Sequence, residues 1–258
     1  MKMKLIFTIL AVTAAVTLSA RQTVKLTGQK EVLTVQKLTV NADGSLSYVL
    51  NGAQKTAPAN TYDYARIPKP REITEAEKVL QSKDYIKAEK LFQIAFEKYR
   101  LLGWGIYCIT RRAEALDGAK RLKDALAFLE QLKGYTSLDP EVRNDVLKAK
   151  MLYVDLLMKS GDLTNAGIIA ESLLSEKSDD AVFFALERKG DIALKKKEKK
   201  TAVRNYLQAI FLIPGHPKRP EVLYKTIVLL KEMKDKRWEK LAEILKKQHP
   251  DSQFAKKI

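Results

Sequence analysis

The chain has 258 residues, of which 47 are Lys or Arg and 31 are Asp or Glu, so its formal net charge is +16 at pH 7. A chain of this length suits one elongated domain with a small appendage and does not require two large globular domains. The single cysteine, Cys108, excludes an intramolecular disulfide. It lies in the apolar stretch 104–109, which favours a buried and inert thiol.

Residues 1–20 have the layout of a secretory signal peptide. Two lysines precede an apolar run at 5–16, small residues close the segment, and no acidic residue occurs in it. The apolar run is shorter than the roughly 20 residues of a membrane span, and an uncleaved anchor is the alternative. Arg21 stands where a lipoprotein would carry cysteine. The sequence therefore predicts a protein of the periplasm or cell envelope that is exported without a lipid anchor. The lack of disulfides is compatible with a bacterial periplasm.

Residues 21–67 are expected to form a small β module. The stretch 31–40 is rich in Val, Leu and Thr, the stretch 45–50 alternates apolar and polar residues, and Asn51-Gly52 is a hairpin signal. Two or three strands of this kind would give a small twisted sheet or an incomplete SH3-like barrel. The prolines that follow predict a linker at 68–73.

The segment 74–258 carries one helical pattern that recurs. In each copy a polar corner is followed by an apolar residue, a small residue, an aromatic or aliphatic residue, and a second small or aliphatic one. The first small residue lies at 88, 125, 166 and 202, in steps of 37, 41 and 36 residues, which is the period of a helical-hairpin array. The copies are Lys83, Asp84, Tyr85, Ala88, Phe92 and Ala95; Lys120, Leu122, Ala125, Leu129 and Leu132; Gly161, Leu163, Ala166, Ala170 and Leu173; and Lys197, Lys199, Ala202, Tyr206, Ala209 and Pro214.

This pattern resembles the tetratricopeptide repeat, in which a Gly-Asp-Tyr-like corner separates two antiparallel helices and an alanine seats the second helix on the first. The fourth copy matches best, because Gly190 also supplies the small residue of the first helix. Val154 departs from the family at the same place in the third copy, and the fifth unit, around Trp238, has no small residue. The resemblance covers residues 72–256. It implies a mainly α fold, a right-handed solenoid of four to five helical hairpins behind the small β module.

The resemblance also implies where a partner would bind. In this family the first helix of each hairpin lines the concave groove, and a protein or peptide lies along it. Acidic residues stand where the family's carboxylate clamp has asparagine, so the sequence favours basic or amide-rich ligands over terminal carboxylates. The predicted groove residues are Tyr107, Arg111, Glu114, Lys148, Met151, Asp155, Phe184, Arg188 and Asp191.

A basic patch offers an alternative. From Glu187 to the C-terminus there are 20 Lys or Arg and 9 Asp or Glu. Such clustered charge attracts anionic lipid headgroups, cell-wall polymer or an acidic protein. Nucleic acid is disfavoured, because no basic sheet interleaved with aromatic residues is present. The patch consists of Lys195, Lys196, Lys197, Lys199 and Lys200.

No pattern in the sequence predicts catalysis. Phosphate-binding loops, nucleophile elbows and His-Glu-x-x-His helices are missing, and His216 and His249 lie far apart in proline-flanked loops without metal-ligand partners at a suitable spacing. The sequence thus predicts no cofactor, no metal and no enzymatic activity. It predicts an exported adaptor that scaffolds an envelope complex, with the anionic-surface binder as the alternative.

Overall fold

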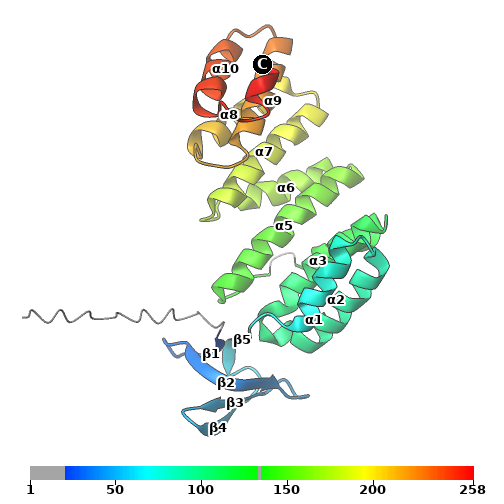
Figure 1. Cartoon of the computed structure of the whole chain (residues 1–258), viewed down its shortest axis with the longest axis vertical. Helices are drawn as coiled ribbons and strands as arrows, with labels where there is room; N and C mark the ends of the chain where they lie inside the picture. The colour runs from blue at the N-terminus through cyan, green and yellow to red at the C-terminus, as the bar shows by residue number, and fades with distance from the viewer. Residues whose placement is uncertain (1–20, 133–134) are drawn as a thin grey trace, which may run out of the picture. The chain divides into compact units, whose positions relative to one another are not determined.

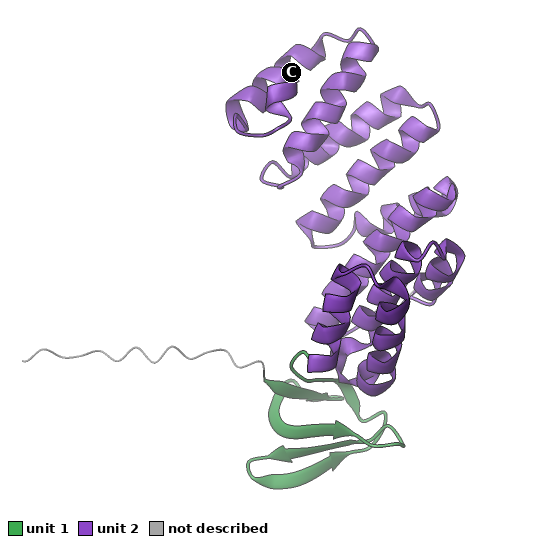
Figure 2. Cartoon of the chain, turned by 45° about the vertical axis from the view of Figure 1, so that its right-hand side comes forward, with its two compact units in different colours: residues 1–70 green, residues 71–258 purple. Residues whose placement is uncertain are grey.

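A computed structural model describes residues 21–132 and 135–258. The predicted signal peptide, residues 1–20, lies outside the described residues. The chain divides at Pro70 and Arg71 into two compact units, which Figure 2 shows in different colours. Among the helices of the described ranges, none is both long and apolar enough to cross a membrane.

The first unit is an antiparallel sheet of five strands in the order β4-β3-β2-β1-β5 (Figure 1). Alternation along the strands places Val24 and Leu46, both fully buried, in a shared apolar layer with Tyr48 and Ala65. The turn residue Asn51 and the following Gly52 both have positive φ, which suits the two-residue β3–β4 hairpin that the sequence predicts. The strands are β1 (Gln22–Leu26), β2 (Leu33–Val40), β3 (Leu46–Leu50), β4 (Ala53–Ala57) and β5 (Tyr62–Arg66).

The β module has more strands than the two or three expected. Strand β4, with the sequence Ala-Gln-Lys-Thr-Ala, is exposed along most of its length and carries no alternating apolar signal. It forms because its backbone pairs with β3 throughout residues 53–57. The β4 and β5 strands are the two edges, so the sheet is open and does not close into a barrel. The first helix begins at Arg71, within the segment 68–73 predicted as a linker.

The second unit consists of helical hairpins. The helices are α1 (Arg71–Gln81), α2 (Tyr85–Tyr99), α3 (Gly105–Gly118), α4 (Leu122–Glu130), α5 (Pro140–Ser160), α6 (Leu163–Leu173), α7 (Asp179–Lys195), α8 (Lys199–Leu212), α9 (Arg219–Glu232) and α10 (Arg237–Gln248). They pair in order as five hairpins, and each hairpin also contacts its neighbour (Figure 1). This confirms the predicted array of helical repeats.

Small residues seat the second helix of each of the first four hairpins. Ala88, Ala125, Ala166 and Ala202 are fully buried. The first two hairpins are joined by a short turn of π-helical type, Arg100–Trp104, in which Gly103 has φ of 85°. Glycine adopts this backbone region without strain, so Gly103 allows the chain to turn between the two hairpins.

Each hairpin corner has one residue in the left-handed region. Gly161 occupies it in the third hairpin, with φ of 89°, whereas lysine occupies it in the other four, at positions 83, 120, 197 and 234. An aspartate follows in three of these corners, and in two of them it caps the second helix: the Asp84 carboxylate accepts a hydrogen bond from the Lys87 amide, and Asp162 does the same for Asn165.

These lysine corners predict a stabilising substitution. We expect Lys120→Gly, at a position with φ of 63°, to raise the free energy of unfolding by up to about 1 kcal/mol, because it removes left-handed strain. Lys123→Gly, three residues away inside α4, should instead lower it by about 1 kcal/mol. Urea denaturation of both variants would check this, and equal losses in both would contradict it.

Candidate functional site

The first helices of the second to fourth hairpins form one face of the second unit. Helix α3 contacts α5, and α5 contacts α7. Ion pairs then connect α7 to α9. We call this surface the inner face. All nine predicted groove residues lie on α3, α5 and α7.

A small polar pocket lies on the inner face between α3 and α5. Its volume is about 160 Å³. Tyr107, Arg111 and Glu114 of α3 line it together with Lys148 of α5, so the structure brings four of the predicted groove residues together. Asp145 of α5, a buried acid that the sequence analysis did not single out, also lines the pocket.

The pocket residues hold one another in place. Arg111 donates a hydrogen bond of 2.6 Å to Glu114 one helical turn away, and its guanidinium lies 5.0 Å from the centre of the Tyr107 ring. The Tyr107 hydroxyl donates to the carboxylate of Glu77 on α1. Arg111 and Glu114 each keep about a third of their side chain exposed. The pocket therefore presents an aromatic edge, a guanidinium and carboxylates that are arranged before a ligand arrives.

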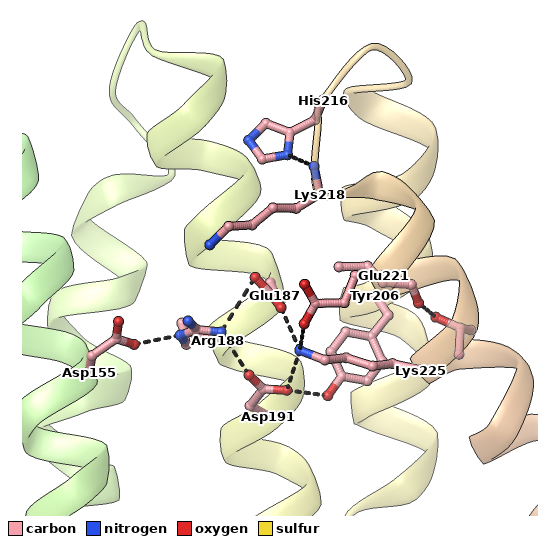
Figure 3. A network of polar contacts seen from close by, with 11 residues as sticks. Asp155, Glu187, Arg188, Asp191, Tyr206, His216, Lys218, Glu221 and Lys225 are labelled. Atoms are coloured by element: carbon pink, nitrogen blue, oxygen red, sulfur yellow. Dashed lines mark hydrogen bonds and ion pairs between the residues drawn. The ribbon is translucent and has the colours of Figure 1, made fainter. Parts of the chain in front are cut away.

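A chain of ion pairs extends along the inner face from α5 through α7 to α9 (Figure 3). Arg188 of α7 contacts Asp155 of α5 at 2.5 Å and Asp191, one turn away, at 3.0 Å. Lys225 of α9 contacts Glu187 of α7 at 2.5 Å and Asp191 at 3.8 Å. We call these residues, with Glu221, the charge ladder; Glu221 lies 3.3 Å from Lys225.

The charge ladder also holds the fourth hairpin together. The hydroxyl of Tyr206 on α8 donates a 2.5 Å hydrogen bond to Asp191, and its ring lies where a side chain at Gly190 would have to be. Burial and this hydrogen bond raise the pKa of Tyr206 above its ordinary value. Burial lowers the pKa of Arg188, but its bond to Asp155 and the nearby carboxylates outweigh this effect and raise the pKa. Both groups keep their usual protonation near neutral pH.

The ladder changes the ligand that the inner face favours. The sequence predicts that the acidic residues Glu114, Asp155 and Asp191 select a basic or amide-rich ligand. In the structure Glu114 is paired with Arg111, and Asp191 with Arg188 and Lys225. Their negative charge is therefore already neutralised. Asp155 is paired with Arg188 as well, but its side chain is 43% exposed and Glu114 is 31% exposed, so both can still accept a hydrogen bond from a ligand.

Two predicted groove residues contribute to packing. Phe184 is buried, and it lies in the apolar core between the third and fourth hairpins with the Arg188 guanidinium 4.9 Å from its ring centre. Met151 is partly buried against the same core. The reason is that neighbouring first helices approach closely enough to cover large apolar side chains between them.

Glu221 and Lys225 are not among the residues that the repeat pattern predicts for the groove. In the fifth hairpin Glu239 stands five residues after the corner residue Lys234, where the first four hairpins have alanine, so its register could not be read from the repeat pattern. A signal was nevertheless present, because Lys225 follows Arg188 by 37 residues, which is one of the observed repeat steps. The two cations occupy corresponding places on consecutive first helices and bind the same aspartate.

The basic patch lies at the corner between α7 and α8. All five lysines are exposed. Lys199 forms a 3.0 Å ion pair with Glu232. The other four make no ion pair with any residue in the described ranges.

Reactive groups are scarce in the described ranges. They contain no group of three or more His, Cys, Asp or Glu that could hold a metal ion. Cys108 is fully buried, and burial raises the pKa of its thiol to about 12, so it is not a nucleophile at neutral pH. His216 stacks on Phe183 with 3.7 Å between ring centres, and its Nε2 lies 3.3 Å from the Asp180 carboxylate. The imidazole is therefore already engaged in contacts within the fourth hairpin.

No protein-family model matches the chain, and no curated protein matches its sequence. Solved structures do match it. They include the nearly identical TPR-like repeats of a kinesin light chain candidate from Podosopora anserina, with 14% identity, 70% of this chain and 95% of that chain covered, and a TM-score of 0.54. RapI in its apo form has 13% identity, a TM-score of 0.59, and coverage of 70% of this chain and 54% of that chain.

A tetratricopeptide repeat protein from Parabacteroides merdae also matches. It has 15% identity and a TM-score of 0.52, with 69% of this chain and 66% of that chain covered. Identities this low establish the fold and do not transfer an activity. The fold agrees with the hairpin period, the seated alanines and the contact between Gly190 and Tyr206. The second unit of this chain therefore has the tetratricopeptide-like repeat fold.

Proposed function

We propose that this protein is a non-enzymatic scaffold of the bacterial cell envelope that binds a protein or peptide partner along its inner face. The observation that carries the proposal is the polar pocket between α3 and α5, in which Tyr107, Arg111, Glu114 and Lys148 converge. Side chains from two successive hairpins thus form one binding surface. Repeat arrays use surfaces of this kind to hold extended chains or helices.

The chemistry of the pocket indicates how a peptide would bind. Arg111 and Lys148 offer donors to backbone carbonyls or to an acidic side chain, while Glu114 accepts from an amide. The Tyr107 ring supplies apolar contact area at little entropic cost, because it is already fixed by Glu77 and Arg111. A volume of about 160 Å³ admits one side chain and excludes a large cofactor.

Charge reversal in the pocket tests this proposal. We expect Arg111→Glu combined with Lys148→Glu to remove the captured partner when the tagged full chain is used as bait in envelope extracts, with quantitative mass spectrometry as the readout. Placing like charges opposite each other at an interface costs several kcal/mol of binding free energy. The mature protein in the same fraction should begin near Arg21, in agreement with cleavage after residue 20.

Replacement of four basic-patch lysines, Lys195, Lys196, Lys197 and Lys199, by glutamine is the control; Lys200 stays in place because it also lines a second cleft, beside α8. None of these lysines lines the pocket, so the partner should still be captured. Thermal melts must show that both variants stay folded. A partner that survives the pocket substitutions but is lost with the lysines would favour the anionic-surface alternative, and an intact Met1 in a cytosolic fraction would contradict export.

A further inference from the structure

A second cleft lies beside α8, the second helix of the fourth hairpin, and it shares no lining residue with the inner-face pocket. Its volume is about 560 Å³. One wall is formed by α8, and the other by Met233, Asp235 and Arg237 at the corner between α9 and α10. We call it the α8 cleft.

The polarity of the α8 cleft changes along its length. Lys200, Arg204, Leu207 and Phe211 follow one another at intervals of three or four residues, so they share one side of the helix. The cations occupy the N-terminal half, and Leu207, Phe211 and Leu212 the C-terminal half. From Lys200 to Leu212 the wall extends about 18 Å, at 1.5 Å per residue. An occupant must therefore be elongated, anionic at one end and apolar at the other.

The apolar half of the α8 cleft is open to water. Phe211 is 56% exposed and Leu212 is 66% exposed, although they are large apolar side chains next to each other. Adjacent exposed apolar groups at a cleft with a polar rim mark an interaction surface. Covering them is favourable in proportion to the apolar area removed from water.

The cationic half of the α8 cleft contains positive charges that are available to bind an anionic group. Arg237 is held by Asp235 at 2.6 Å. Lys200 and Arg204 form no ion pair with any residue in the described ranges. The surrounding sequence is also basic, with 20 Lys or Arg against 9 Asp or Glu from Glu187 onward. This field attracts an acidic partner and repels a basic one.

We propose that the α8 cleft docks an amphipathic helical segment of a partner protein, with acidic residues at one end and large apolar side chains at the other. A fatty acid or a single lipid has the same head-to-tail polarity. Sites for such ligands bury about 70–90% of the ligand surface. The exposed Phe211 and Leu212 would leave an acyl chain largely in water, whereas a helix covers them with its own apolar face.

The test uses a fluorescently labelled helical peptide with glutamates in one half and leucine and phenylalanine in the other. Fluorescence anisotropy with the full chain should detect binding. Lys200→Glu with Arg204→Glu, and separately Phe211→Ser with Leu212→Ser, should each weaken it by about tenfold or more. A scrambled peptide of the same composition should bind at least about tenfold more weakly, because its charges and apolar groups no longer match the two halves.

Matched variants separate docking from general attraction. Lys246→Glu with Lys247→Glu makes the same charge change on α10, outside the cleft. Ile94→Ser removes an apolar side chain of similar exposure, 61%, from α2. Both should leave peptide affinity within about threefold of the parent chain.

Three outcomes are informative. Equal binding of the scrambled peptide would overturn the proposal, and so would an equal loss of affinity on substitution of Lys246 and Lys247. Displacement of the peptide by phosphatidylglycerol vesicles that depends on Phe211 and Leu212 would also overturn it, in favour of a membrane. Loss of the inner-face partner leaves all these results unchanged, so the two proposals fail separately.

Discussion

Replacement of Lys225 by methionine is expected to lower the free energy of unfolding by about 3 kcal/mol or more. Lys225 is the hydrogen-bond donor to Glu187, whose side chain is only 2% exposed. Within the described residues the other oxygen of Glu187 has no hydrogen-bond partner and only Arg188 at 3.4 Å. Removing Lys225 would leave the buried Glu187 carboxylate without its hydrogen-bond donor, so little would offset the loss of its hydration. Chemical denaturation monitored by circular dichroism would measure the loss.

A double-mutant cycle isolates the cause. Glu187→Gln combined with Lys225→Met should recover part of the loss, because the neutral amide no longer needs a cation. Lys199→Met is the matched control: its ion pair with Glu232 is about half-exposed on both sides, so its removal should change stability by less than about 1 kcal/mol. Equal effects of Lys199→Met and Lys225→Met would show that the charge ladder adds no stability.

Substitution of Gly190 by alanine should destabilise the fourth hairpin by about 1–3 kcal/mol. A methyl group there would fall well inside van der Waals contact with the ring of Tyr206. Tyr206 is fully buried and its hydroxyl is held by Asp191, so the ring has no space into which it could move. The expected readout is a lower thermal midpoint and a weaker tyrosine near-ultraviolet signal.

Substitution of Gly167 by alanine is expected to change stability in the opposite direction. It lies inside α6, and an added methyl group would meet nothing within 4 Å. Gly167→Ala should therefore raise stability by up to about 1 kcal/mol, since alanine favours the helix. If both substitutions change the thermal midpoint in the same direction, helix propensity and not the contact with Tyr206 decides the outcome at Gly190.

The sequence alone determined the repeat architecture of this protein. Small residues at a period of 36 to 41 predict seated helices, and Ala88 and Ala202 are indeed fully buried. Asn51-Gly52 predicts the hairpin that joins β3 and β4. These signals are local, because they depend on spacing within one hairpin or on the backbone freedom of a turn residue. Strand β4 could not be predicted, because it forms through backbone pairing with β3 and its side chains carry no strand pattern.

Only the tertiary structure decided what the charged side chains do. The residues of the inner face could be placed on first helices from the repeat, but their pairings join hairpins that are far apart in the chain. Arg188 meets Asp155 across 33 residues, and Lys225 meets Glu187 across 38. Likewise, Met233 joins Phe211 in the α8 cleft only because α9 packs against α8. Side-chain partners across repeats depend on how neighbouring helices pack, and the spacing of residues within one hairpin carries no record of that packing.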